Sequence, residues 1–167
     1  MSEDPAHYHR ANDPTLFEVF IAGDPKAQPR PRAFVRGGKV SVYDPATAEG
    51  WKNAIAVACQ PLAQAQLTGA LSLQLEFYHK RPASHLRANG RELKPSAPAW
   101  HCHKPDVDNL AKAVLDALTA IGVWHDDRQV TQLCVARYWA DPPEPSGCLL
   151  SLIQLQPQLQ PQLSPTP

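Results

Sequence analysis

The chain has 167 residues and a mass of 18.4 kDa, which suits a single domain, because domains typically contain roughly 100 to 200 residues. Hydrophobic residues make up 43% of the sequence and charged residues 19%, so the chain can bury a core and is not disordered as a whole. Its formal net charge is zero, which by itself argues against a polyanionic partner such as nucleic acid. Proline, with 18 residues, has about twice its usual share, which indicates loops and tails around a smaller folded body.

No segment reads as a secretory signal or as a membrane span, because the N-terminal residues lack an apolar stretch and no long uncharged apolar run follows. The four cysteines are widely spaced without a Cys-x-x-Cys pair, so we expect reduced thiols in a cytoplasmic protein that does not contact membranes. Residues 1–14 and the Pro/Gln-rich residues 156–167 show no periodicity and are expected to be disordered tails. The folded domain is therefore predicted to span residues 15–155.

The first half of this domain predicts two strands, a hairpin and a helix. In chain order we expect a strand at 15–22, a hairpin with strands at 33–35 and 40–43, a helix capped by Asp44 or Thr47 that runs to about Leu62, and a strand at 69–80. In the last of these, leucine and phenylalanine alternate with polar residues, as in a half-buried strand. Residues 82–104 follow without a pattern, and a loop of this length is usually functional or disordered.

The second half contains the strongest periodic element. Apolar residues recur on one helical face from Val107 to Ile121, with Asp106 or Asp108 placed as the cap and Gly122 placed to end the helix. Strands are expected at 130–139 and 147–155, joined by a proline-rich loop. The resulting order predicts an α+β fold in which two helices pack on a small mixed, mostly antiparallel sheet.

The zero net charge conceals a strong segregation of charge along the chain. From 24 to 52 there are six basic and three acidic residues, and from 79 to 104 six basic and one acidic. From 106 to 127 the balance reverses, with five acidic residues and one lysine. Basic loops can neutralise phosphates, and clustered carboxylates can recruit a hard divalent cation such as Mg²⁺. The alternative is that the basic loops are merely solvated and that the aspartates cap helices and turns.

The acidic segment has a spacing of its own. Asp106 and Asp108 lie two residues apart at the predicted start of a helix, and Lys112 follows one turn after Asp108, where it can pair with that carboxylate or reach a phosphate. Asp126 and Asp127 follow a tight turn, which could return one of them to the helix start if the next strand lies alongside. Clustered carboxylates repel one another unless a cation compensates their charge.

The segment KPDVDNLAKAVLDALTAIGVWHDDRQV resembles the signature of the RusA family of Holliday junction resolvases: Asp-x-Asp-Asn-Leu, a lysine four residues after the second aspartate, Leu-Asp-Ala-Leu, and Trp-x-Asp-Asp. The segment GDPKAQPRPRAF resembles the basic loop of the same family, with Arg30, Pro31 and Arg32 in register. It departs from the family pattern at 27–29, where a lysine is lost, and Lys26 and Lys39 are expected to compensate. The resemblance extends in order over roughly residues 17–155.

The resemblance implies a RusA-like homodimeric endonuclease that uses Mg²⁺, with Mn²⁺ as a substitute, and nicks a four-way DNA junction at two symmetric positions, leaving 5′-phosphate ends in DNA recombination and repair. Its metal-binding carboxylates fall on Asp106, Asp108 and Asp127, and its catalytic lysine on Lys112. Asp126 is expected to be a supporting or turn residue, and Asp116 a local partner of Lys112. The residues expected to contact DNA are Lys26, Arg30, Arg32, Arg36, Lys39 and Lys104.

Three other interpretations stay open on sequence grounds. The protein could be a broader nuclease of flaps and forks, or a junction-binding protein without catalytic activity. A zinc-stabilised module is suggested by His101, Cys102 and His103, although adjacent residues lack the ligand spacing of structural zinc sites. Trp100, in the long loop, is a candidate for stacking on an unpaired base, while Trp51, Trp124 and Trp139 are expected in the core or an interface.

Overall fold

The computed structural model describes residues 15–29, 32–36, 39–43 and 48–155 of the chain. Both expected tails, the helix caps Asp44 and Thr47, and Arg30 lie outside the described residues. In 32–36 and 39–43 the backbone is described but the side chains are not. Within these ranges no helix has the length and apolar character needed to cross a membrane.

Four strands form one mixed sheet in the order β1-β6-β4-β5. They are β1 (Thr15–Ala22), β4 (Leu71–Lys80), β5 (Val130–Ala140) and β6 (Gly147–Gln154). Strand β6 pairs antiparallel with β1 and β4, whereas β5 pairs parallel with β4. A parallel pair needs a long crossover connection, and the segment between β4 and β5, which contains a helix, supplies it. The predicted mixed, mostly antiparallel sheet is therefore confirmed.

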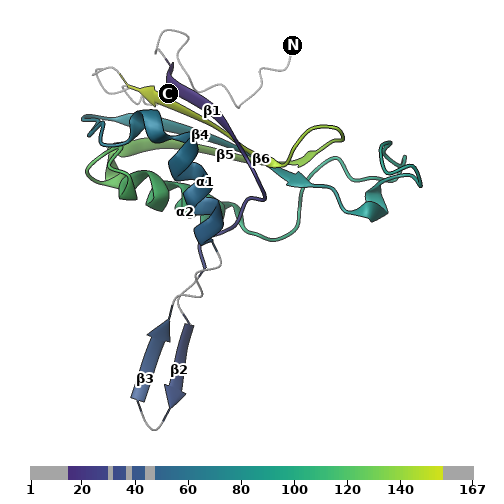
Figure 1. The fold of residues 1–167 in the computed structure, drawn as a ribbon, viewed down its shortest axis with the longest axis horizontal. Helices are drawn as coiled ribbons and strands as arrows, with labels where there is room; N and C mark the ends of the chain where they lie inside the picture. The colour runs from purple at the N-terminus through teal and green to yellow at the C-terminus, as the bar shows by residue number, and fades with distance from the viewer. Residues whose placement is uncertain (1–14, 30–31, 37–38, 44–47, 156–167) are drawn as a thin grey trace, which may run out of the picture.

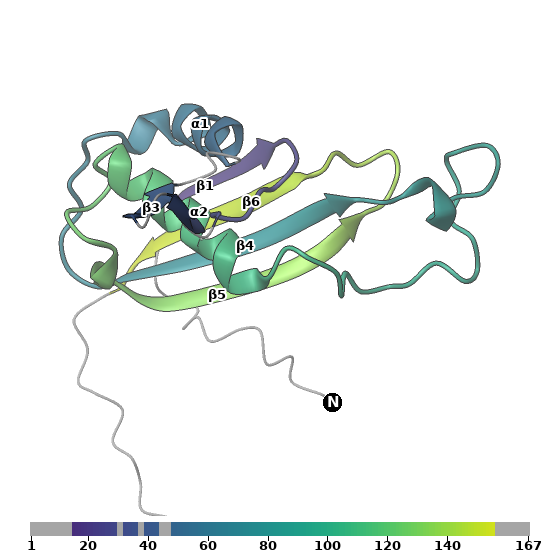
Figure 2. The ribbon, with the colours of Figure 1, turned by 90° about the horizontal axis from the view of Figure 1, so that it is seen from below.

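Two helices, α1 (Glu49–Ala58) and α2 (Val107–Ala120), cover one face of this sheet (Figures 1 and 2). Alternate residues of β4 point toward them and are fully buried: Leu71, Leu73, Leu75 and Phe77. Helix α1 ends at Ala58 rather than near Leu62, and a short 3₁₀ turn, η1 (Gln60–Leu62), follows it. Pro61 explains the early end, because proline supplies no backbone N–H for a further helical hydrogen bond.

Helix α2 packs through a face that is rich in small residues. Its buried side chains are Leu110, Ala111, Ala113, Val114, Ala117 and Leu118. This agrees with the predicted apolar stripe except at its first residue, Val107, which is 38% exposed. The chain leaves the helix through Gly122, whose φ of +75° lies in the left-handed region that glycine adopts most easily. Trp124 then packs into the core, and its Nε1 donates a hydrogen bond of 2.7 Å to Thr119 Oγ1.

Two elements project from this body. One is the predicted hairpin of β2 (Arg32–Arg36) and β3 (Lys39–Tyr43), which forms a separate two-stranded sheet (Figure 1). The other is residues 82–99, here called the arm, which leave the sheet after β4 and contain the 3₁₀ turn η2 (Ala83–His85). Figure 2 shows the arm extending well beyond the ends of β4 and β5. The loop predicted at 82–104 is thus largely an ordered projection.

Candidate active site

The N-terminus of α2 carries two acidic side chains that lack partners. Asp106 occupies the N-cap position with an extended backbone, yet its side chain accepts no capping hydrogen bond. Asp108 lies exposed in the first turn. Among the described residues, neither carboxylate makes a hydrogen bond or an ion pair. Because neither carboxylate is engaged, both are available to a cation.

Lys112 lies one helical turn after Asp108 but pairs with a residue one turn further toward the C-terminal end of α2. Its Nζ donates a hydrogen bond of 3.1 Å to Asp116 Oδ1. Asp116 is therefore the local partner of this lysine, as predicted. The lysine side chain is 58% exposed, and an exposed ion pair of this kind contributes little to stability. The pair consequently leaves Lys112 free to exchange Asp116 for another anion.

The two aspartates after α2 differ in what they do. Asp126 caps the 3₁₀ turn η3 (Asp127–Gln129): its Oδ1 accepts a hydrogen bond of 2.9 Å from the Arg128 N–H, and the Gln129 side chain accepts from the Asp126 N–H. Asp126 is thus a turn residue. Asp127 is exposed, and its carboxylate has no hydrogen-bond or ion-pair partner within the described part of the chain.

Asp127 does not lie beside Asp106 and Asp108 in a single chain. The turn is held at the C-terminal end of α2, where the Val123 N–H donates to the Leu118 carbonyl at 3.1 Å. The 14 residues of α2 correspond to a length of about 21 Å, and Figure 2 shows the turn at the end of α2 opposite to its start. The expectation that the turn returns Asp126 or Asp127 to the helix start is therefore wrong within one chain. Across residues 15–29 and 48–155, no three His, Cys, Asp or Glu side chains are grouped as metal ligands.

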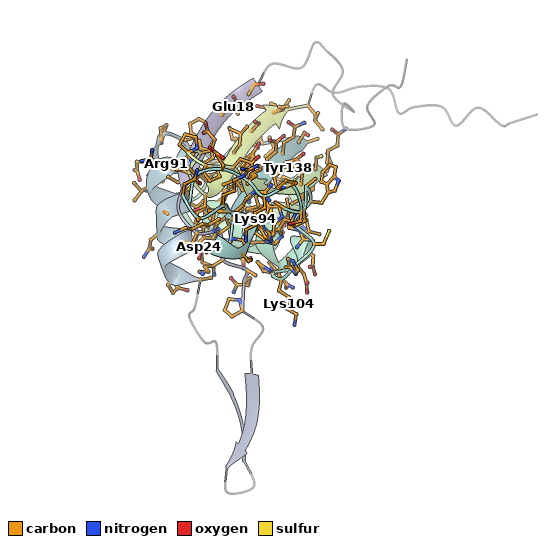
Figure 3. All side chains as sticks on the ribbon, turned by 90° about the vertical axis from the view of Figure 1, so that its right-hand side faces the viewer. Glu18, Asp24, Arg91, Lys94, Lys104 and Tyr138 are labelled. Carbon is orange, nitrogen blue, oxygen red and sulfur yellow. The ribbon has the colours of Figure 1, made fainter. Side chains whose placement is uncertain are left out.

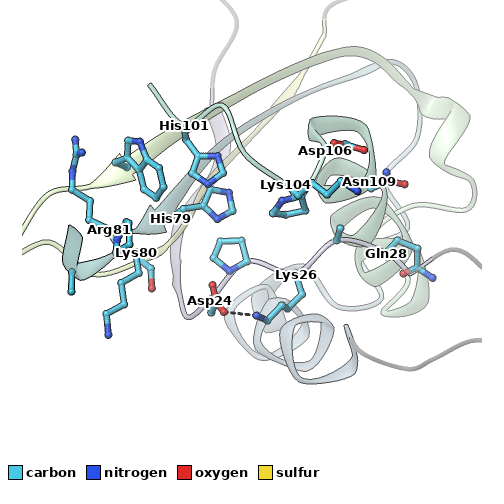
Figure 4. A pocket seen from close by; sticks show the side chains of 17 residues that line it. Asp24, Lys26, Gln28, His79, Lys80, Arg81, His101, Lys104, Asp106 and Asn109 are labelled. Carbon is cyan, nitrogen blue, oxygen red and sulfur yellow. Dashed lines mark hydrogen bonds and ion pairs between the residues drawn. The ribbon is translucent and has the colours of Figure 1, made fainter. Parts of the chain in front are cut away.

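An open groove of about 1120 Å³ lies beside the start of α2. Figure 4 shows Gln28, Asn109 and Asp106 toward one end of it and Lys80 and Arg81 toward the other. The Gln28 N–H donates to the Asn109 carbonyl at 2.9 Å, which ties the loop after β1 to α2.

Two of the predicted DNA-contacting residues line this groove. Lys26 forms an ion pair with Asp24, and Lys104 is exposed beside Asp106. Arg32, Arg36 and Lys39 belong to the hairpin strands, and Arg30 lies outside the described residues. Their contacts with DNA stay predictions.

Two stacked histidines form the floor of the groove between its ends (Figure 4). The rings of His79 and His101 lie 4.1 Å apart at an interplanar angle of 23°, and each residue is only 6% exposed. Burial, followed by the neighbouring His101, lowers the pKa of His79 to about 4, and burial also lowers the pKa of His101. Both rings are therefore uncharged at neutral pH. The sequence indicates that His79 is buried, because this residue continues the inward-facing alternation of β4.

Three side chains from the ends of β4 and β5 hold the segment that leads to α2. Arg137 Nη1 donates to the carbonyls of His103 and Pro105 at 2.8 and 2.5 Å. Trp139 Nε1 donates to the Trp100 carbonyl at 3.0 Å, and Arg81 Nη1 donates to the Pro98 carbonyl at 2.9 Å. Sequence reasoning missed these roles, because side chain to backbone contacts across 17 to 39 positions leave no local pattern.

Comparison with known proteins identifies the family. A family model described as endodeoxyribonuclease RusA matches residues 22–144, a span from the end of β1 to just beyond β5. The chain belongs to the RusA endodeoxyribonuclease family. The resemblance inferred from the two motifs is thereby confirmed, and Asp106, Asp108, Lys112 and Asp127 all fall inside the matched span.

Of two relatives of this RusA-family chain, one is uncharacterized and the other is named for an enzymatic activity. The chain is 36% identical over 127 residues to the uncharacterized protein YqaN of Bacillus subtilis, covering 74% of this chain and 87% of that protein. It is 31% identical over 84 residues to the crossover junction endodeoxyribonuclease RusA of Shigella sonnei, covering 36% of this chain and 70% of that enzyme.

Proposed function

We propose that this RusA-family protein is a Mg²⁺-dependent endodeoxyribonuclease that resolves four-way DNA junctions by paired, symmetric nicks. The observation that carries the proposal is the pair of unpartnered carboxylates at the start of α2, Asp106 and Asp108. Asp106 lines the groove that also contains Lys26 and Lys104. The Shigella sonnei relative, named as a crossover junction endodeoxyribonuclease, supports this substrate class.

The donor set fits a hard divalent cation. Mg²⁺ prefers carboxylate oxygens and is usually held by one or two carboxylates together with the substrate phosphate. Asp106, Asp108 and Asp127 have no partners among the described residues, so none would need to break an interaction to bind the ion, and Mn²⁺ should substitute for it. When bound, the ion polarises the phosphate and lowers the pKa of a bound water.

Basic side chains of the protein supply positive charge for the reaction and for holding the substrate. Lys112 is expected to leave Asp116 and to offset the negative charge that develops on the phosphate in the transition state. Lys104 and Lys26 hold the flanking phosphates in the groove. The products are a 5′-phosphate and a 3′-hydroxyl, because water attacks phosphorus and the 3′ oxygen leaves with a proton.

The position of Asp127 favours a homodimer with shared sites. Helix α2 runs antiparallel to β5. Asp127 therefore lies just before the start of β5, whereas Arg137, near the end of that strand, holds the residue before Asp106. A two-fold axis near the middle of β5 would bring Asp127 of each chain to Asp106 and Asp108 of the other.

Strand β5 has the features of an edge that can pair with a second copy. It is the last strand of the described sheet, and near its middle Leu133 is 46% exposed and Cys134 is an exposed free thiol. An unpaired edge strand is a template for a strand from another chain. If the β5 strands pair across the axis, mild oxidation should link two chains through Cys134 in a Cys102→Ser background. If the protein is shown to be a dimer in solution and this link does not form, the result would count against pairing through β5.

Cleavage of a synthetic four-way junction tests the activity. The wild type should nick it only with Mg²⁺ or Mn²⁺, and Asp106→Asn or Asp108→Asn should abolish nicking while junction binding persists. Wild-type rates from either variant would refute the assignment of these carboxylates. If the wild type binds but never cuts, the alternative of an inactive junction-binding protein is correct.

Mixing two inactive variants tests whether the sites are shared. A heterodimer of Asp106→Asn and Asp127→Asn chains contains one intact site if Asp127 acts in the partner's site, and no intact site if each chain acts alone. Re-mixed chains should therefore regain single nicks but few resolved junctions. Failure to regain nicks, with heterodimers demonstrated, would exclude sharing.

A substrate panel separates junction resolution from the broader nuclease alternative. Four-way junctions, forks, flaps and linear duplex should be compared at equal concentration. Junctions cut in preference to forks and flaps support the proposal, whereas equal cutting of flaps favours a general branched-DNA nuclease.

A further inference from the structure

The arm (82–99) is an ordered element that the catalytic chemistry does not require. The Arg87 N–H donates to the Glu92 carbonyl at 2.8 Å, and the Lys94 N–H donates to the His85 carbonyl at 2.9 Å. The Asn89 side chain accepts from the N–H groups of Arg91 and Glu92 at 3.1 and 3.2 Å. The arm thus folds back on itself through backbone and side-chain hydrogen bonds.

The base of the arm is fixed to the sheet. Arg81 Nε lies 2.6 Å from Asp141 Oδ1, and the arginine side chain is only 5% exposed. The same side chain also holds the Pro98 carbonyl at the other end of the arm. Because one buried guanidinium ties both ends to the loop after β5, the direction in which the arm projects is set by the sheet.

The arm carries a net positive charge on exposed side chains. Its charged residues are Arg87, Arg91 and Lys94 against Glu92, and all four are exposed. Arg87 Nε lies 3.6 Å from Glu92 Oε2, and Lys94 Nζ donates a hydrogen bond to the Ser84 carbonyl. The Arg91 guanidinium, in contrast, has no partner among the described residues. These charged residues do not cover a buried apolar core, since the apolar Leu86 and Leu93 of the arm are only half-buried.

The groove joins the arm to the other basic projection. Its lining extends from Gln28, just before the approach to the β2–β3 hairpin, past Asp106 and Lys104 to Pro82 and Ala83, the first residues of the arm. Figure 3 looks onto the arm end and shows Lys94 and Lys104 on this side of the molecule, with Lys104 closer to the hairpin. A DNA strand in the groove would therefore meet the arm on leaving the site.

We propose that the arm binds the phosphate backbone of one duplex of the branched substrate, away from the cut and without regard to base sequence. Arg91 and Arg87 are the principal contacts. The proposal rests on the proposed function, since it assumes DNA in the groove. Such contacts act through release of counterions, so they strengthen binding and depend on salt without changing the chemical step.

The test compares the double variant Arg87→Gln/Arg91→Gln with the wild type on junctions with long and short duplex arms. On long arms the variant should bind about tenfold more weakly, and the slope of log affinity against log salt should fall by about 2. On short arms, which end before they reach the projection, affinity should not change. Cleavage of bound, saturating junction should also proceed at the wild-type rate.

Glu92→Gln is the matched control, because it removes the one acidic side chain of the arm and should strengthen binding to long arms. An unchanged affinity of the double variant on long arms, or an equal loss on short arms, would overturn the proposal. Either result would leave the proposed function standing if the wild type still resolves junctions. Conversely, wild-type protein that shows the arm-length effect but no cleavage would refute the nuclease function alone.

Discussion

Arg137, on β5, donates hydrogen bonds of 2.8 and 2.5 Å to the carbonyls of His103 and Pro105, and Pro105 immediately precedes Asp106. One guanidinium thereby determines where the chain enters α2. The position of Asp106 consequently depends on a strand that lies later in the sequence, and the same strand begins just after Asp127. Arg137 is a positioning residue, which acts on the carboxylates through the backbone.

Replacing Arg137 tests this role. If Asp106 is a metal ligand as proposed, Arg137→Ala should slow cleavage about 10–100-fold and should raise the Mg²⁺ concentration needed for half-maximal rate. Arg137→Lys retains one charged donor and should recover part of the rate, and added guanidinium should partly rescue Arg137→Ala. A variant with normal Mg²⁺ dependence and merely lower thermal stability would show that Arg137 is only structural.

The Lys112–Asp116 pair predicts a separation of activity from stability. Lys112→Ala should lower the single-turnover nicking rate by roughly 100-fold or more, because a cation near the reacting phosphate is lost. The free energy of unfolding should change by less than about 0.5 kcal/mol, since the pair is exposed. Asp116→Asn should leave the rate within a few-fold of wild type. A large loss of rate in Asp116→Asn would instead assign that carboxylate to the site.

Asp126 and Asp127 should show opposite effects although they are neighbours. Asp126→Ala removes the cap of η3 and should lower the free energy of unfolding by about 1 kcal/mol, with junction cleavage largely retained. Asp127→Asn should leave stability unchanged and abolish cleavage. Chemical denaturation and a cleavage assay on both variants test this, and the reverse pattern would favour Asp126 over Asp127 as the proposed metal ligand.

The buried His79 predicts a loss of stability in acid. Its pKa is lowered from 6.5 to about 4, so between these values the unfolded chain binds the proton more readily than the folded chain. The stability associated with His79 is complete above pH 6.5, is lost as the pH falls toward 4, and amounts to about 3 kcal/mol. Urea unfolding of wild type and His79→Phe, which can keep the stack, should differ in this slope. Parallel pH profiles would contradict the prediction.

Periodicity predicted most elements closely because their burial patterns are local. Strand β1 has the predicted bounds, and β4 and α2 bury the predicted faces. Helix α1 ends at Ala58, earlier than the apolar pattern predicts, because Pro61 cannot continue the helical hydrogen bonds. The arm could not be predicted as ordered, since the hydrogen bonds that hold it come from side chains such as Arg81, which leave no periodic signal.

By itself, the sequence determined the fold class, the family motifs and the identity of the candidate carboxylates, because helix and strand periods and motif spacings are properties of neighbouring residues. It also showed that a net charge of zero is the sum of opposed segments. Only the tertiary structure decided which of these groups meet. The direction of β5 separates Asp127 from Asp106 by the length of α2, and side-chain contacts with distant carbonyls orient Asp106 and the arm. Such contacts join residues far apart in sequence, and strand direction is fixed only when the sheet assembles.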